Sequence, residues 1–266
     1  MSYNKKEPIV LISGFKAGTW LMRKVLSNIT GMNFFEPDII AGEKKYYNPA
    51  QLQFVDNHFY SWHLVPADEV IDKLNTHNAK TIFVVRNIYD LVVSVYYHFY
   101  NNIDADIGRA NNKDKFLKQF SFEEGLSLII TGFDEDGVRW SGMTEIVQHY
   151  NEIFKATKRC DSLVIDYDDL VKNKNSVIKN IVDFLDISIT SQEIEKTSSL
   201  TDFTSMKKEA QKNKVGVSHF REGKAGLNRE KLSQFHKVQL RQMIKISALE
   251  IYTNAKKIKM ENIVEF

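Results

Sequence analysis

The sequence predicts an α/β fold in which a central parallel β-sheet is flanked by helices and carries a loop like a P-loop. Three observations predict it. Residues 8–13 form an apolar strand that leads into a glycine-containing loop and a helix, residues 81–85 form a second such strand before a helix, and strands alternate with helices through most of the 266 residues. This alternation is typical of parallel βαβ units, whose ligands bind beyond the carboxyl ends of the strands.

The elements are predicted in order as follows. The first strand is Pro8–Ser13, Gly14–Gly18 form the loop, and apolar residues recur at helical spacing from Thr19 until Gly31 ends the helix. The remaining predicted strands lie near Tyr60–Leu64, at Thr81–Val85 and at Ser162–Tyr167. The remaining predicted helices lie after Val85, at Val177–Leu185 and at Lys237–Lys259. In the last helix we expect four residues to face inward, namely Leu240, Ile244, Leu249 and Ile251.

We expect one domain over residues 1–266, because the chain has only 4 prolines and 12 glycines and no low-complexity linker or repeat. Residues 101–150 contain no predicted strand. We therefore expect this segment to form a helical cap that faces the substrate.

Composition restricts the classes of function. Hydrophobic residues make up 43% and charged residues 26% of the chain, as in ordinary globular proteins. The net charge of only +2 argues against a nucleic-acid partner. The one cysteine, Cys160, excludes an intrachain disulfide and is expected to be a small apolar residue before a strand. No apolar stretch predicts a membrane span or a signal peptide, so a cytoplasmic location is expected.

The first motif is the loop from Ser13 to Trp20. Amides of a glycine-containing turn and of a helix start can bind an anion, and Lys16 adds a full charge beside them. The loop lacks the G-x-x-x-x-G-K-[ST] order of a Walker A motif. On this segment alone, an ordinary strand-to-helix turn with a solvated lysine explains the pattern equally well.

The second motif runs from Arg86 to Phe99. Arg86 closes a strand, where a guanidinium can hold a phosphate with two hydrogen bonds, and Ser94 in the next helix offers a hydroxyl. The alternative is that Arg86 pairs with Asp90 and that Ser94 has no special role.

Together these motifs resemble the sulfotransferases that use 3′-phosphoadenosine 5′-phosphosulfate (PAPS). That family has a loop P-K-S-G-T-T-W after its first strand, matched here at Lys16, Gly18 and Thr19. It also has a 3′-phosphate segment R-N-x-x-D-x-x-x-S-x-Y-x-H-F, matched at every stated position from Arg86 to Phe99. A third family segment, R-K-G-x-x-G-D-W-K, resembles Arg221–Arg229.

The sequence departs from the family at several positions. Phe15 stands in place of the usual proline, and Trp20 and Leu21 replace Thr-Trp, whose tryptophan stacks on adenine in the family. In the third segment Glu222, Leu227 and Asn228 differ. How adenine is held is therefore left open.

The resemblance implies a set of site residues. Trp62–Pro66 resembles the strand-end segment that carries the family's catalytic base, which makes His63 the expected base and His58 its rival. Tyr167, in a Y-E-D-L-like segment, and Thr201 and Phe203, in a T-S-F-like segment, would contact adenine. The residues expected to bind the nucleotide are Lys16, Ala17, Gly18, Thr19, Trp20, Arg86, Ser94, Tyr167, Thr201, Phe203, Arg221, Glu222 and Gly223.

The reaction that the resemblance implies is transfer of a sulfuryl group from PAPS to an acceptor hydroxyl or amine, with adenosine 3′,5′-bisphosphate (PAP) as the product. Lys16 would stabilise the leaving group, and His63 would take the acceptor proton with an ordinary pKa near 6.5. No metal is expected. A P-loop kinase or NTPase and a non-catalytic nucleotide-binding protein are the alternatives, a small-molecule acceptor is favoured, and a homo-oligomer is possible but not readable from the sequence.

Overall fold

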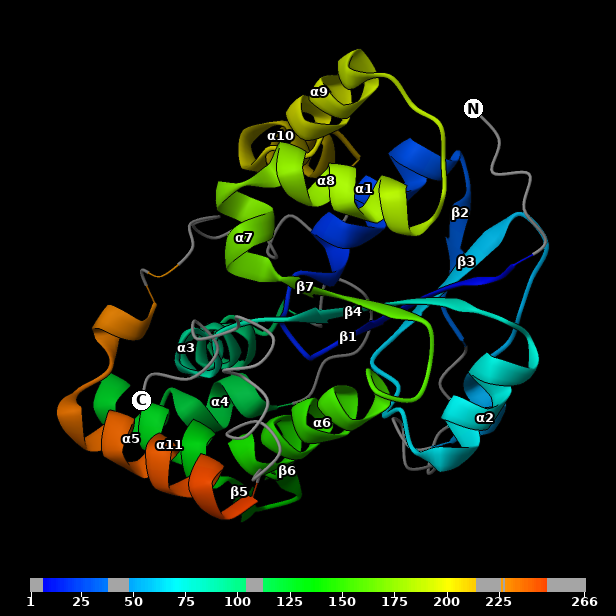
Figure 1. Cartoon of the computed structure of the whole chain (residues 1–266). Helices are drawn as coiled ribbons and strands as arrows, with labels where there is room; N and C mark the ends of the chain where they lie inside the picture. The colour runs from blue at the N-terminus through cyan, green and yellow to red at the C-terminus, as the bar shows by residue number, and fades with distance from the viewer. Residues whose placement is uncertain (1–6, 38–47, 104–111, 214–225, 227, 248–266) are drawn as a thin grey trace. The chain divides into compact units, whose positions relative to one another are not determined.

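A computed structural model of the chain describes residues 7–37, 48–103, 112–213, 226 and 228–247 (Figure 1). The chain divides into two compact units. The first unit comprises the residues up to Arg86 together with His149–Thr201, and the second comprises Asn87–Gln148 and the residues from Asp202 onward. One domain over residues 1–266 stays a prediction.

The first unit is built on a five-stranded parallel sheet, which confirms the predicted fold class. Its strands run in the order β2-β3-β1-β4-β7, and all neighbours are parallel. Their bounds are β1 Ile9–Ser13, β2 Asn33–Phe35, β3 His58–Trp62, β4 Lys80–Val85 and β7 Ser162–Asp166.

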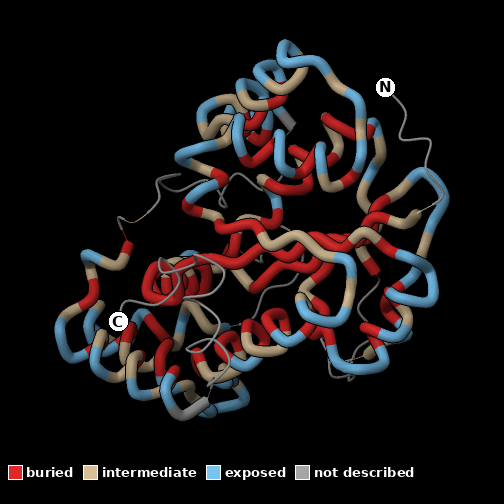
Figure 2. Tube along the Cα trace, viewed as in Figure 1, coloured by how far each residue is buried: buried red, intermediate tan, exposed pale blue. Residues whose placement is uncertain are grey.

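Helices cover both faces of this sheet. The bounds in the first unit are α1 Thr19–Thr30, η1 Pro49–Gln51, α2 Asp68–Thr76, α7 Tyr167–Lys172, α8 Lys174–Phe184, α9 Ser191–Leu200 and the second half of α6, Met143–Ala156. Helices α1 and α8 pack on the face that carries Ile9, Leu11 and Val84, and α2 lies on the opposite face (Figure 1). All five residues of β1 are buried, as expected for a strand covered on both faces (Figure 2).

Several strand boundaries differ from the prediction. The strand expected near Tyr60–Leu64 is β3, which begins two residues earlier and ends at Trp62, so that His63 lies just beyond its end. The three-residue strand β2 was not predicted, because it is too short and too exposed to show an apolar pattern. Gly31 does end α1, with the left-handed backbone, φ 72°, that favours glycine after a helix.

In the described residues, the second unit contains helices and one short hairpin. Its bounds are α3 Ile88–Tyr100, α4 Lys113–Leu117, α5 Phe122–Thr131, β5 Phe133–Glu135, β6 Val138–Trp140, the first half of α6, α10 Phe203–Asn213, η4 Arg229–Lys231 and α11 Gln234–Ser247. The prediction that residues 101–150 contain no strand is therefore wrong, since β5 and β6 pair antiparallel. That this segment faces the substrate stays a prediction.

The first part of the predicted terminal helix corresponds to α11. Leu240 and Ile244 are fully buried, as expected. Leu249 and Ile251 lie outside the described residues, as does the rest of the predicted helix beyond Ser247.

Candidate active site

The carboxyl ends of four parallel strands bring the predicted site residues of the first unit to one edge of the sheet. Ser13 at the end of β1 is aligned with Val84 of β4, and Val85 with Asp166 of β7. On the other side, Ile12 is aligned with Trp62, the last residue of β3. The segments that follow these strand ends, which carry Lys16, His63, Arg86 and Tyr167, therefore start from the same edge.

The loop between β1 and α1 has a backbone suited to an anion. Lys16 has φ 62° and Gly18 has φ 101°, both in the left-handed region that occurs in anion-binding turns, and the N–H of Ala17 donates within the loop to the carbonyl of Gly14 at 3.0 Å. Gly18 precedes α1 without a capping side chain among the described residues, and the first turn of α1 contains no acidic residue. The first amides of α1, from Thr19 on, thus remain directed at a potential anion.

Two buried contacts make glycine necessary in this loop. A Cβ atom on Gly14 would lie 2.2 Å from Cε1 of Tyr150, and one on Gly18 would lie 2.4 Å from Cδ2 of Tyr167. The hydroxyl of Tyr150 also accepts a hydrogen bond from the backbone N–H of Arg86, at 2.8 Å. Tyr150 thereby fixes the start of the loop and the residue that follows β4 in one arrangement.

Arg86 has a buried hydrogen-bond donor in a position that suits an anion. The residue is 7% exposed, and its Nε is buried without a hydrogen-bond partner among the described residues. Its guanidinium lies over the ring of Tyr167, 4.4 Å from the centroid, and Nη1 donates a long bond of 3.4 Å to the carbonyl of Lys16. A buried donor of this kind costs free energy unless a ligand satisfies it, and a phosphate fits it.

His63 is held in one tautomer. Its Nδ1 lies 2.7 Å from the carbonyl oxygen of Ser13. A carbonyl only accepts, so Nδ1 must carry the proton and Nε2 the lone pair. The ring edge of Phe15 packs on the imidazole at 5.9 Å between centroids.

Burial changes the basicity of this histidine. Burial lowers the pKa of His63 to about 3, and the positive charges of Arg23 and Lys16 act in the same direction, while the bond to Ser13 opposes them. The expectation of an ordinary pKa near 6.5 is therefore wrong for the ligand-free protein. With this pKa the imidazole is neutral at pH 7.

His58 lies at the other end of the same strand. It is the first residue of β3, and its Nδ1 bonds to the carbonyl of Asp56 at 2.8 Å. At about 3.3 Å per strand residue, the two histidines are roughly 16 Å apart along the chain. His58 therefore lies far from the edge that carries Lys16, and this position favours His63 as the base.

The other predicted residues have the following positions. Thr201, at the end of α9, is buried and its hydroxyl donates to the carbonyl of Thr197 at 2.7 Å. Ser94 on α3 and Phe203 at the start of α10 belong to the second unit, so their roles stay predictions. Arg221, Glu222 and Gly223 lie outside the described residues.

The ring of Trp20 packs edge-on against Phe34 of β2, 6.3 Å between centroids. Tyr167 follows β7, the outermost strand on the side of the sheet away from β2. The role of Trp20 in binding the nucleotide stays a prediction. Leu21 itself packs against the hydrophobic core.

Three buried residues near this edge were missed in the sequence. Tyr150 holds Arg86, and His149 beside it binds the carbonyl of Leu64 through Nε2 at 3.0 Å. Arg23 contacts β3 from α1. An apolar pattern marks α6 and α1 as buried helices, but it does not reveal which polar side chains on them reach the strand ends.

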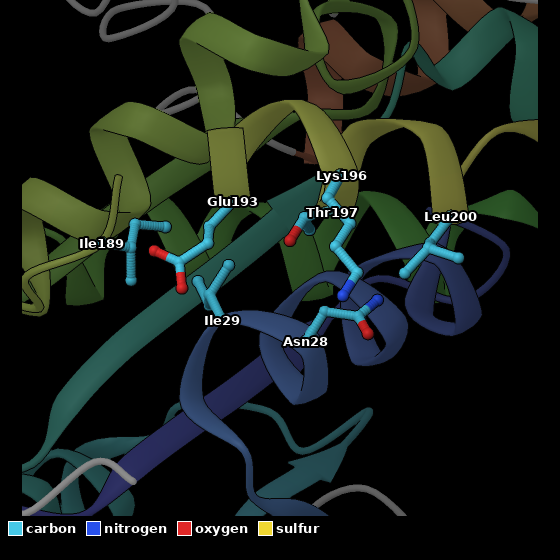
Figure 3. A pocket seen from close by; sticks show the side chains of 7 residues that line it. All are labelled: Asn28, Ile29, Ile189, Glu193, Lys196, Thr197 and Leu200. Atoms are coloured by element: carbon cyan, nitrogen blue, oxygen red, sulfur yellow. The ribbon is translucent and has the colours of Figure 1, made fainter. Parts of the chain in front are cut away.

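A separate cavity of about 260 Å³ lies between α1 and α9 (Figure 3). It is lined by Asn28, Ile29, Ile189, Glu193, Lys196, Thr197 and Leu200. Asn28 is about 14 Å along α1 from Thr19, at 1.5 Å per residue, so the cavity is distinct from the anion loop.

Comparison with known proteins decides the family. A model of the sulfotransferase domain matches residues 7–259. This chain belongs to the sulfotransferase family. The family prediction and the prediction of an enzyme that transfers a sulfuryl group are thereby confirmed.

Relatives of this sulfotransferase are distant. It is 24% identical to "Sulfotransferase 6B1" of Danio rerio over 251 residues, which cover 90% of this chain and 76% of that protein. It is 29% identical to the Mus musculus protein of that name over 161 residues, 60% of this chain and 47% of the relative. The latter match spans about half the length of that relative.

Solved structures show the same fold. Mouse sulfotransferase SULT7A1 complexed with PAP has a TM-score of 0.64 at 20% identity, with 90% of this chain and 82% of that chain covered. Retinol dehydratase in complex with androsterone and PAP has a TM-score of 0.64 at 17% identity, with 90% and 80% covered. In the described part of this sulfotransferase, no helix is long and apolar enough to cross a membrane.

Proposed function

We propose that this sulfotransferase moves the sulfuryl group of PAPS to a hydroxyl or amine of a small-molecule acceptor and releases PAP. The buried Nε of Arg86, which has no partner among the described residues, carries the proposal. This nitrogen would bind one anionic group, and the adjacent loop that carries Lys16 would bind a second. PAPS has two such groups, a phosphosulfate and a 3′-phosphate, whereas ATP and ADP have no 3′-phosphate.

The donor would be held by both sites of the first unit. The loop from Gly14 to Gly18, with the first amides of α1, would receive the phosphosulfate, and Arg86 would receive the 3′-phosphate. Tyr167 and Thr201 remain our candidates for the adenine side, because Leu21 offers no aromatic ring and Trp20 lies toward β2.

Transfer would proceed by in-line displacement. The acceptor oxygen or nitrogen attacks sulfur, the bond from sulfur to the bridging oxygen breaks, and its electron pair leaves with the 5′-phosphate of PAP. Lys16 and the loop amides stabilise the negative charge that develops on that oxygen. Nε2 of His63 accepts the acceptor proton, since Nδ1 already donates to Ser13.

Donor binding would strengthen the base. The pKa of His63 is low in part because Lys16 contributes a positive charge nearby. An anionic phosphosulfate beside Lys16 offsets that charge and raises the pKa of the imidazole. His63 would thus be a stronger base when the donor is present than when it is absent.

The reaction as written requires no metal, because the transferred group carries less charge than a phosphoryl group. The described residues contain no group of three or more side chains arranged to hold a metal ion. A small-molecule acceptor is supported by the related retinol dehydratase, whose structure contains androsterone. A cytoplasmic location stays a prediction.

Sulfur transfer from labelled PAPS tests the proposal. The purified chain is incubated with ³⁵S-PAPS and a panel of phenols, sterols, sugars and amines, and labelled product and PAP are measured by chromatography. We expect PAP and labelled product to appear in equal amounts for at least one acceptor, and His63→Ala to abolish both. Transfer of the γ-phosphate from ATP to the same acceptors, without transfer from PAPS, would instead support a kinase.

A further inference from the structure

Helix α1 carries a buried arginine that contacts the strand of the proposed base. Arg23 is 5% exposed. Its Nε donates to Oγ of Ser61 at 2.7 Å and its Nη2 to the carbonyl of Ser61 at 2.9 Å. Its Nη1 donates to the carboxylate of Glu36, just after β2, at 2.8 Å. Three parts of the first unit are therefore tied together by one guanidinium.

The contacted residue lies close to His63 along the chain. Ser61 is two residues before His63, which follows the end of β3, and Ser61 is aligned with Leu11 of β1. The hydroxyl of Ser61 contacts Arg23, so this side chain lies on the face of the sheet that α1 covers.

A second polar contact lies one helical turn earlier. The hydroxyls of Thr19 and Ser13 are 2.6 Å apart, and the carbonyl of Ser13 accepts from Nδ1 of His63. Thr19 and Arg23 are at i and i+4 on α1 and so face the same side. Thr19 thus links α1 to β1, and Arg23 links α1 to β3.

The burial of Arg23 has a cost in free energy, because a charged group loses its hydration. Burying a guanidinium is unfavourable before its partners are counted, and a well-packed apolar side chain is often as stable. Each guanidinium nitrogen of Arg23 donates a hydrogen bond, and the side chain also stacks on Phe34, with 4.3 Å from its Cζ to the ring centroid. Arg23 lies one helical turn beyond the first residue of α1 and binds β3, the strand that precedes the proposed base.

We propose that Arg23 is a positioning residue for sulfuryl transfer, which locks the helix that begins at the donor loop to the strand that ends at His63. This inference rests on the proposed function. The distance between the loop of Lys16 and Nε2 of His63 is then set by the contact between Arg23 and Ser61. A displacement of about 1 Å at a reacting group can cost about 10² in rate.

The same contact brings a fixed charge close to the imidazole. Positive charge on Arg23 disfavours protonation of His63, together with Lys16 in the loop and His149 on α6, and burial adds the largest effect. Among the described residues, Glu36 is the negative group that pairs with Arg23. Removing the charge of Arg23 should therefore raise the pKa of His63.

Two substitutions separate position from charge. Arg23→Lys keeps the charge but loses the planar fork that binds both atoms of Ser61, and Arg23→Gln loses the charge as well. We expect kcat to fall at least about tenfold in both, with the Kd of PAP by calorimetry changed less than about threefold. The acid limb of the pH–rate profile should move to higher pH in Arg23→Gln only.

Arg159→Gln is the matched control, because Arg159 pairs with Asp68 on the exposed surface. It should leave kcat and the pH profile at parental values. If Arg23→Gln does not fold, Ser61→Ala removes one acceptor without changing charge and should still lower kcat about threefold to tenfold with unaltered PAP binding.

The two proposals fail in different ways. If both Arg23 variants and Ser61→Ala lower only the Tm, with parental kcat and pH profile, Arg23 is a structural residue and the inference is overturned. If the parent protein does not transfer sulfur from PAPS, or if His63→Ala keeps the parental rate, the proposed function fails first.

Discussion

Replacing Gly14 by alanine tests whether Tyr150 sets the shape of the donor loop. The new Cβ would lie 2.2 Å from Cε1 and 2.9 Å from the hydroxyl oxygen of Tyr150. Tyr150 is fully buried, and its hydroxyl holds the N–H of Arg86. The ring therefore cannot move away without loss of that hydrogen bond.

The expected cost follows from these two contacts. Forcing a methyl group into a packed site costs about 1–3 kcal/mol, and breaking one hydrogen bond costs about 1 kcal/mol more. We expect Gly14→Ala to lower the free energy of unfolding by about 2–4 kcal/mol in urea titrations. PAP binding, measured by calorimetry, should weaken as well, because both the loop and Arg86 are displaced.

A double-mutant cycle isolates the contact. In a Tyr150→Leu background the ring is gone, so Gly14→Ala should cost less than about 0.5 kcal/mol, giving a coupling of at least about 1.5 kcal/mol. Equal costs of Gly14→Ala in the two backgrounds would refute the reasoning. Parental PAP affinity in the Gly14→Ala protein would refute it too.

Four further predictions test the roles proposed for the loop and the base. Lys16→Ala should lower kcat by about 10²–10³ and affect the Kd of PAP much less, which steady-state kinetics and calorimetry would show. Because burial lowers the pKa of His63 to about 3 in the free protein, kcat/KM for PAPS should be nearly flat between about pH 5 and 8. An inflection near pH 6.5 would contradict this. His63→Ala should lose most activity and His58→Ala almost none, and the reverse would assign the base to His58. Gly18→Ala should weaken PAP binding even after Tyr167→Ala removes the clash, because φ 101° remains strained for alanine.

The parallel sheet and the anion loop could be predicted because their signals are local. A fully apolar run marks a strand that is covered on both faces, and Gly18 with Gly31 marks the two ends of α1. The β5–β6 hairpin also had a local signal, since Asp136-Gly137 has positive φ at both residues and Asp-Gly is a strong hairpin pair. The prediction of a segment without strands over residues 101–150 did not take this pair into account.

The buried polar contacts could not be predicted, because they join residues distant in sequence. Arg23 reaches Ser61 and Tyr150 reaches Arg86 only after the sheet has formed. The pKa of His63 depends on the same packing, so an ordinary value was the natural expectation from its residue type. The sequence shows which polar residues follow a strand, but it does not show which side chains surround them in the folded protein.

Recognition of the 3′-phosphate is the most direct test of the central claim. Hydrogen bonds to charged groups contribute about 1.5–3 kcal/mol each, and ADP would leave the buried Nε of Arg86 unpaired. PAP and ADP are titrated by calorimetry into the parent and into Arg86→Ala. We predict that the parent binds PAP at least about a hundredfold more tightly than ADP and that Arg86→Ala removes most of this difference while ADP binding scarcely changes. Equal affinity of the parent for PAP and ADP would contradict the account and support a kinase or NTPase.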